Sequence, residues 1–148
     1  MKRPPEVYVL FFLHLLLSLN ALIGGTLLVV EPEGSLLGMH PEWLHRMPFA
    51  DYTLPGILLF IFNGLLPSLT LIGLFMKHAW QWANLFNMYV DKYWAWTYSL
   101  YCGIILIIWI TVQLSITQYF WLQPLFISMG LLIILFTMMP RVQKYYSI

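Results

Sequence analysis

The stretch VYVLFFLHLLLSLNALIGGTLLVV, from Val7 to Val30, decides the class of fold because it contains no charged residue. A helix that crosses the hydrocarbon core of a bilayer needs about 20 mostly apolar residues. Polar side chains interrupt the stretch at only a few positions, among them His14, Ser18 and Asn20. The stretch therefore predicts a membrane-spanning helix.

The composition of the whole chain agrees with this prediction. Its 148 residues are 61% hydrophobic and only 9% charged, whereas soluble domains are about 45–50% apolar and about 25% charged. A net charge of +1 gives no reason to expect a nucleic-acid partner. The single cysteine, Cys102, excludes an internal disulfide and any multi-cysteine metal or iron–sulfur site.

Three more apolar segments follow the first span of about residues 7–30, at about residues 54–76, 97–117 and 121–139. Since lipid-exposed irregular backbone is not tolerated in the hydrocarbon core, all four are expected to be helices. The last two are so close in sequence that they predict a tight antiparallel hairpin. The sequence thus predicts an all-α fold, an antiparallel four-helix transmembrane bundle that forms a single domain over residues 1–148.

The distribution of charge predicts which way the bundle points. Arg46 lies in the loop 31–53, which also carries four carboxylates, but six of the seven basic residues fall on the other side of the four spans. The positive-inside rule then places both termini and the loop 77–96 in the cytoplasm, and the loop 31–53 outside. Trp94 and Trp96 are expected to anchor the chain in the aromatic belt of the membrane.

The outer loop is unusually apolar, and its segment HPEWLHRM, residues 40–47, predicts a short amphipathic helix. Pro41 suits a first helical position, and Glu42 suits the positive end of the helix dipole. Trp43 shares one face with other large apolar residues and would anchor the helix at headgroup depth. The loop is therefore expected to cover the outer end of the bundle as a lid.

A metal site in this loop is the sharper alternative to an acidic lid. His40, His45 and Glu42 are of metal-ligand type, but the two histidines are five residues apart rather than four, and no HExxH motif is present. The acidic lid is therefore favoured, and no cofactor is predicted. A bis-histidine haem site on His14 and His78 is disfavoured because the two residues lie at different depths.

Amide side chains inside the spans are candidate binding residues, because polar groups are costly in a bilayer. Asn20 and Asn63 fall near the middle of the membrane, Gln113 lies nearer the outer surface, and Gln123 lies at the outer rim. The amides either hydrogen-bond between helices or line a polar cavity beneath the lid, together with Trp43. In the second span, Pro67 is expected to kink the helix.

No catalytic motif is found, so an enzyme is not predicted. The leading hypothesis is a membrane protein that binds a lipid-like or small amphipathic molecule, or the helices of a partner, in the outer half of the bundle. One alternative is a subunit of a small oligomeric transporter or channel. Another is a membrane haem, metal or quinone redox protein. Membrane lipids, further copies of the chain and partner membrane proteins are the expected partners.

Three motifs, WAWT, IWITVQ and WLQP, carry a resemblance that extends over about residues 25–140. In these motifs the chain resembles a group of small, uncharacterised bacterial integral membrane proteins with four helices. The resemblance implies a bacterial inner-membrane setting and a four-helix topology. It assigns no catalytic or binding residue.

Overall fold

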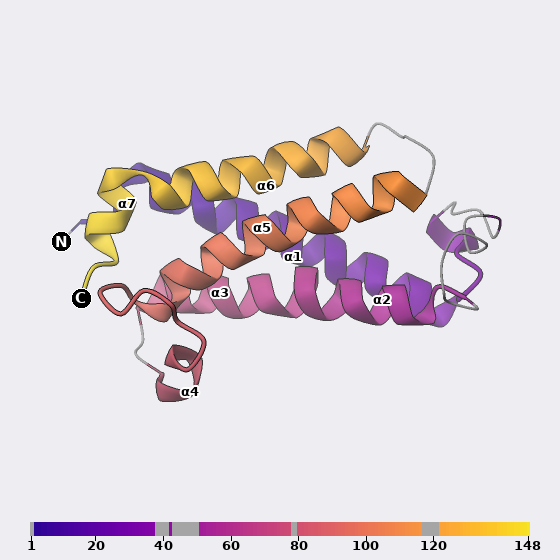
Figure 1. Cartoon of the computed structure of the whole chain (residues 1–148), viewed down its shortest axis with the longest axis horizontal. Helices are drawn as coiled ribbons and strands as arrows, with labels where there is room; N and C mark the ends of the chain where they lie inside the picture. Colours follow the sequence, from indigo (N-terminus) through magenta and orange to yellow (C-terminus); the bar gives the residue numbers. More distant parts are fainter. Residues whose placement is uncertain (1, 38–41, 43–50, 78–79, 117–121) are drawn as a thin grey trace.

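The computed structural model describes most of the chain, namely residues 2–37, 42, 51–77, 80–116 and 122–148. Over these residues the fold is all-helical (Figure 1). The predicted amphipathic helix of residues 40–47 lies outside the described part, apart from Glu42. The elements in chain order are α1 (Pro5–Val30), the 3-10 turn η1 (Ser35–Leu37), α2 (Thr53–Leu59), the π-helix η3 (Phe60–Leu65), α3 (Leu66–Met76), α4 (Gln81–Asn84), α5 (Trp94–Ile116), α6 (Leu122–Met138) and α7 (Pro140–Tyr145).

In the part of the chain that the structure describes, three helices are long and apolar enough to cross a membrane. They are α1, the continuous helix made of α2, η3 and α3, and α5, with 22 to 26 residues in the apolar part of each. The helix α6 is equally apolar but has only 17 residues, the lower limit of the lengths that cross a bilayer. The structure therefore confirms an all-helical fold with three helices of spanning length, and does not establish the fourth crossing.

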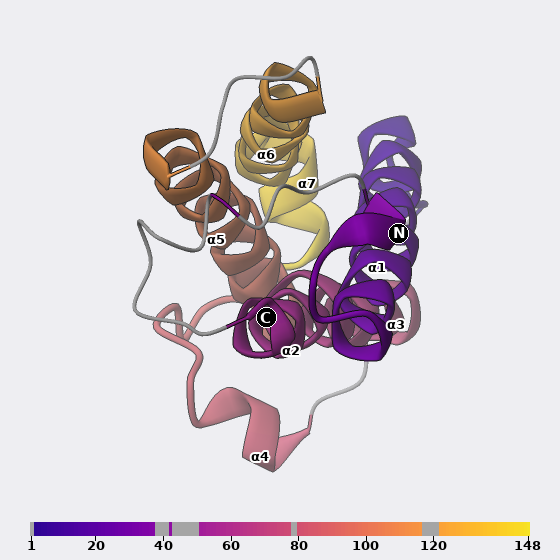
Figure 2. The ribbon, with the colours of Figure 1, turned by 90° about the vertical axis from the view of Figure 1, so that its right-hand side faces the viewer.

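The long helices pack as two antiparallel pairs (Figures 1 and 2). In one pair α1 lies along α2, η3 and α3, and in the other α5 lies along α6. Contacts of α3 with α5 and of α1 with α6 join the pairs. The start of α1 and the C-terminus lie at the same end of the molecule, on the left of Figure 1, which is called the terminal end below.

Glycines bring the backbones together within each pair. A Cβ atom added to Gly25 in α1 would lie 2.7 Å from the carbonyl oxygen of Gly56 in α2. In the other pair, a Cβ atom on Gly103 would lie 3.0 Å from the carbonyl oxygen of Gly130. Small residues are the usual means of close helix approach in membranes, where van der Waals contact replaces the hydrophobic effect.

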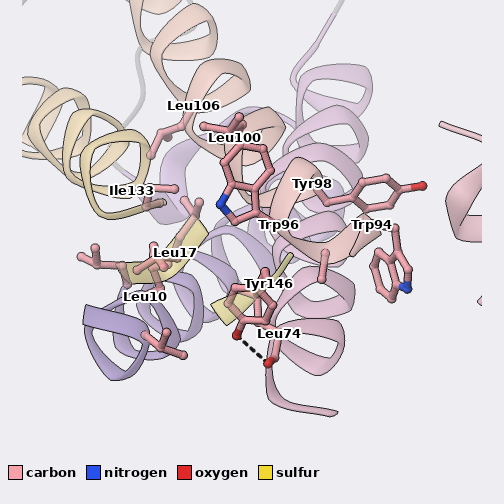
Figure 3. Packing of buried hydrophobic residues seen from close by; sticks show 14 of the residues in the cluster. Leu10, Leu17, Leu74, Trp94, Trp96, Tyr98, Leu100, Leu106, Ile133 and Tyr146 are labelled. Carbon is pink, nitrogen blue, oxygen red and sulfur yellow. Dashed lines mark hydrogen bonds between the residues drawn. The ribbon is translucent and has the colours of Figure 1, made fainter. Parts of the chain in front are cut away.

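An aromatic core fills the terminal end of the bundle (Figure 3). Trp94 and Trp96 are only 1% and 2% exposed, so the expectation that they anchor in the aromatic belt is wrong. The indole of Trp96 donates a 2.8 Å hydrogen bond to the carbonyl of Thr137. The hydroxyl of Tyr146 donates a 2.7 Å bond to the carbonyl of Leu74, and both residues are fully buried. A satisfied N–H or O–H allows such rings to be buried.

The C-terminal segment fastens this end of the bundle. The backbone N–H of Tyr93 donates to the carbonyl of Tyr146 over 3.0 Å, and the N–H of Ile148 donates to the carbonyl of Asp91 over 2.8 Å. These bonds attach the chain after α7 to the segment that precedes α5. The bond from Tyr146 to the end of α3 adds a third element to the same contact.

We expect Gly25→Ala to destabilise the protein by about 1–3 kcal/mol, because the added methyl group overpacks the contact with Gly56. The matched control is Gly24→Ala, where the nearest atom to the new Cβ is a Leu59 methyl group at an ordinary 3.5 Å. The control should be neutral or stabilising by up to about 1 kcal/mol. Unfolding by sodium dodecyl sulfate in mixed micelles measures both variants, and equal losses would contradict the close contact.

Tyr146→Phe should cost about 1–2 kcal/mol, because it removes a hydrogen bond between two fully buried residues. Tyr89→Phe, at an exposed tyrosine, is the control.

Burial raises the pKa of the Tyr146 hydroxyl above its ordinary value of 10.0. Since the unfolded chain ionises first, the free energy of unfolding should fall as pH rises above about 10. Tyr146→Phe should lack that part of the slope, and an unchanged slope would count against the buried hydroxyl.

Candidate functional site

A chain of three buried polar side chains joins three helices inside the bundle. The Nε2 atom of His14 in α1 lies 2.8 Å from the Oγ atom of Ser99 in α5. That hydroxyl lies 2.7 Å from the Oγ1 atom of Thr137 in α6. All three residues are fully buried. In a bilayer, which offers no water, such hydrogen bonds hold helices together.

Three further polar contacts involve the helix that contains η3. The hydroxyl of Ser18 in α1 donates to the carbonyl of Gly64 in η3 over 3.2 Å and also contacts the hydroxyl of Ser68. The Oγ1 atom of Thr70 in α3 lies 3.4 Å from the sulfur of Cys102 in α5. With the first chain, these contacts connect all the long helices by side-chain hydrogen bonds.

The pair of His14 and Ser99 has the spacing of a base and a nucleophile, but its surroundings do not suit catalysis. Neither side chain has exposed surface through which a substrate could reach it. In the described part of the chain, the Nδ1 atom of His14 has no hydrogen-bond partner, so no third group orients the imidazole as in a catalytic triad. The described residues also contain no group of His, Cys, Asp and Glu that could hold a metal ion. The pair is best understood as a link between helices.

Asn63 differs from His14, which keeps one hydrogen bond, because both polar atoms of its side chain lack a partner among the described residues. It is fully buried in η3, and neither its Nδ2 nor its Oδ1 atom has a hydrogen-bond partner among the described residues. A buried amide without partners costs about 1–3 kcal/mol. Unsatisfied groups of this kind in native proteins call for an explanation, such as a bound water or a functional role.

Pro67 gives a local reason for the π-helix that holds Asn63. Because proline has no N–H, it cannot donate to the carbonyl four residues earlier, which is that of Asn63. The backbone here shifts to bonds that span five residues, and the N–H of Leu66 donates to the carbonyl of Ile61. The helix thus departs from the α-helical pattern before Pro67 as a π-helix, a feature found often at functional sites. The expected kink at Pro67 stays a prediction.

A groove runs along the outside of η3, in the half of the bundle away from the termini. Its volume is about 430 Å³, and its walls come from the last two turns of α1, from α2 and from η3. The walls are almost wholly apolar. The lining residues are Gly25, Thr26, Val29, Val30, Ile57, Phe60, Ile61 and Leu65.

The structure separates the amides that the sequence grouped together. Asn63 and Gln123 are fully buried, and Gln113 is partly buried. Asn20, in contrast, is exposed on α1, where its Nδ2 atom donates a 2.7 Å bond to the carbonyl of Leu16 in the same helix. Among the described residues, Asn20 therefore bonds within its own helix, and it does not share the interior with Asn63.

Of the four candidate residues in the outer loop, the structure describes only Glu42. Glu42 is exposed. Trp43, His40 and His45 lie outside the described residues, so the lid and the metal site stay predictions.

Hydroxyl side chains are the polar groups that sequence reasoning missed. The sequence analysis chose amide side chains as candidates, whereas Ser99 is the residue that contacts both His14 and Thr137. One signal was present: Ser99 lies three positions from both Trp96 and Cys102, so these three residues, all buried, share one face of α5.

Comparison with known proteins identifies no related protein. No family model matches the chain, and neither a curated protein nor a solved structure matches it. The resemblance to small bacterial membrane proteins stays a prediction. The structure itself defines the class of protein only as far as an all-helical chain with three helices able to span a membrane.

Ser99→Ala should destabilise the protein by about 1–2 kcal/mol, because it leaves His14 and Thr137 without their shared partner. Ser128→Ala is the control, since this exposed hydroxyl bonds to the carbonyl of Pro124 in its own helix. Unfolding by sodium dodecyl sulfate compares the two variants. Equal stability would mean that the buried chain does not hold the helices together.

Proposed function

We propose that the chain is a multi-pass protein of a bacterial inner membrane, that α6 is its fourth crossing, and that both termini are cytoplasmic. An even number of crossings returns a chain to the side on which it began, and the start of α1 and the C-terminus lie at the same end (Figure 1). The excess of Lys and Arg on that side supports the orientation. The antiparallel packing of the apolar α6 on α5 supports the fourth crossing.

We further propose that the outer half of the bundle binds a lipid-like, amphipathic molecule. The unpartnered amide of Asn63, deep in the protein, carries this proposal. An amide both donates and accepts hydrogen bonds, so it suits a hydroxyl, ester or carbonyl group of a ligand. Such a group, entering with the ligand, would offset the cost of burying the amide.

An apolar groove on the outside of η3, the π-helix that carries Asn63, suits the apolar part of the same molecule. Phe60, Ile61 and Leu65 of the π-helix line it, and Asn63 lies between them in sequence. Its volume of about 430 Å³ falls within the range of about 300–1,000 Å³ that is usual for small-molecule sites. Entry of the polar group requires a local opening of η3, whose bonds already depart from the α-helical pattern.

A helix of a partner protein, or of another copy of the chain, is the second candidate for the groove. Gly25 and Thr26 lie on its wall, and small residues of this kind allow two membrane helices to approach closely. The transporter, channel and redox hypotheses stay predictions.

Native mass spectrometry of the protein purified in a mild detergent, with an absorption spectrum of the same sample, tests the ligand. We expect the wild-type protein to retain a defined extra mass and Asn63→Leu to lose it. Thr111→Leu, which removes an exposed hydroxyl that bonds to Ile107 in its own helix, should retain it. In the absence of the ligand, Asn63→Leu should be about 1 kcal/mol more stable than wild type, because it removes an unpaired buried amide.

Other results would decide against this proposal. A bare wild-type protein would contradict a bound ligand, and a mass lost equally from both variants would contradict the role of Asn63. A co-purifying membrane protein would favour the partner helix, and a coloured sample would favour the redox alternative.

A further inference from the structure

A second groove lies between α1 and α3, in the half of the bundle nearer the termini. Its volume is about 540 Å³, larger than that of the outer groove, and its walls are almost wholly apolar. The lining residues are Phe11, Phe12, Leu15, Leu71, Ile72, Phe75 and Met76. Under the proposed topology this groove faces the acyl chains of the cytoplasmic leaflet.

The guanidinium group of Arg3 lies over the two rings that line the groove at this end. Its Cζ atom is 4.6 Å from the ring centroid of Phe75 and 5.5 Å from that of Phe11. Hydrogen bonds fix its position, one of 2.7 Å to the carbonyl of Phe75 and one of 3.3 Å to the hydroxyl of Tyr145. A guanidinium carries five N–H donors, more than these two bonds use, and its planar fork matches a phosphate.

Two lysines lie near Arg3, one through a shared contact and one as its neighbour in sequence. Lys77 directly follows Met76 in the groove wall, and its Nζ atom lies 4.2 Å from the ring centroid of Tyr145, the tyrosine that Arg3 also contacts. Lys2, next to Arg3 in sequence, is exposed. Glu6, the nearby carboxylate of α1, lies 3.8 Å from the guanidinium of Arg141 and is thus partly neutralised. This end of the groove is therefore positively charged.

We propose that this inner groove binds an anionic glycerophospholipid of the cytoplasmic leaflet. An acyl chain lies against Phe12, Leu15 and Ile72, and Arg3 binds the phosphate. Basic sites between transmembrane helices on the cytoplasmic side bind anionic headgroups in this way. The choice of leaflet rests on the topology proposed above. The preference for an anionic lipid rests only on the groove and Arg3, and is independent of any ligand near Asn63.

The experiment compares two lipids on delipidated protein by native mass spectrometry. We expect phosphatidylglycerol to be retained about fivefold more strongly than phosphatidylethanolamine of the same chain length, as one favourable cation near a headgroup implies. Arg3→Gln should abolish this preference and Arg3→Lys should keep part of it. Lys144→Gln, which removes an exposed charge from the same side, should leave it unchanged. Equal retention of both lipids by wild type, or the same loss in Lys144→Gln, would overturn the proposal.

A second pair of variants leaves Arg3 intact, so that loss of folding in Arg3→Gln cannot obscure the result. Ile72→Trp fills the groove, whereas Ile104→Trp makes the same change on α5 at a position of similar exposure, 47% against 46%. Only Ile72→Trp should lower retention of phosphatidylglycerol. Equal effects of the two variants, or full displacement of the lipid by soluble glycerol phosphate, would mean that the apolar groove takes no part and would overturn the site. Whether Asn63→Leu loses the ligand proposed for the outer half of the bundle changes none of these outcomes.

Discussion

A bilayer offers no water to a polar group, so each polar side chain carried by these helices must find its partner inside the protein or in its own helix. Most of the polar residues of the spans meet this requirement. Ser99 joins His14 to Thr137, and exposed Asn20 turns back to its own backbone. The unpartnered amide of Asn63 departs from this pattern, and for that reason it carries more information about function than the residues that are satisfied.

The two ends of the bundle differ in how they are held. At the terminal end, a buried aromatic core and the backbone bonds of the C-terminal segment join α3, α5 and α7. Toward the other end, α1 and α2 meet at the glycines Gly25 and Gly56, and an apolar groove follows them. Asn63, whose amide has no partner among the described residues, lies between these two regions in the continuous helix of α2, η3 and α3.

Much of the fold could be predicted because length and composition suffice to identify a helix of membrane-spanning length, as in Val7–Val30. The rotation of each helix could not be predicted, since lipid and protein core select the same apolar side chains and leave no amphipathic pattern. Asn20 and Ser99 show the result: an amide expected inside lies outside, and a serine given no role lies at the centre. Burial of Trp94 was missed for a related reason, because tryptophan is common both at membrane interfaces and in cores.

The π-helix has a consequence for the number of residues between Gly56 and Pro67. A turn that bonds over five residues rather than four advances the helical phase by one residue, about 100°. Gly56 meets Gly25 with this offset included. Because the wide turn of η3 takes up one residue more than an α-helical turn, removal of one residue from it can restore the α-helical pattern and leave Gly56 against Gly25. The number of residues in this segment is therefore less strictly constrained than the glycine at the contact.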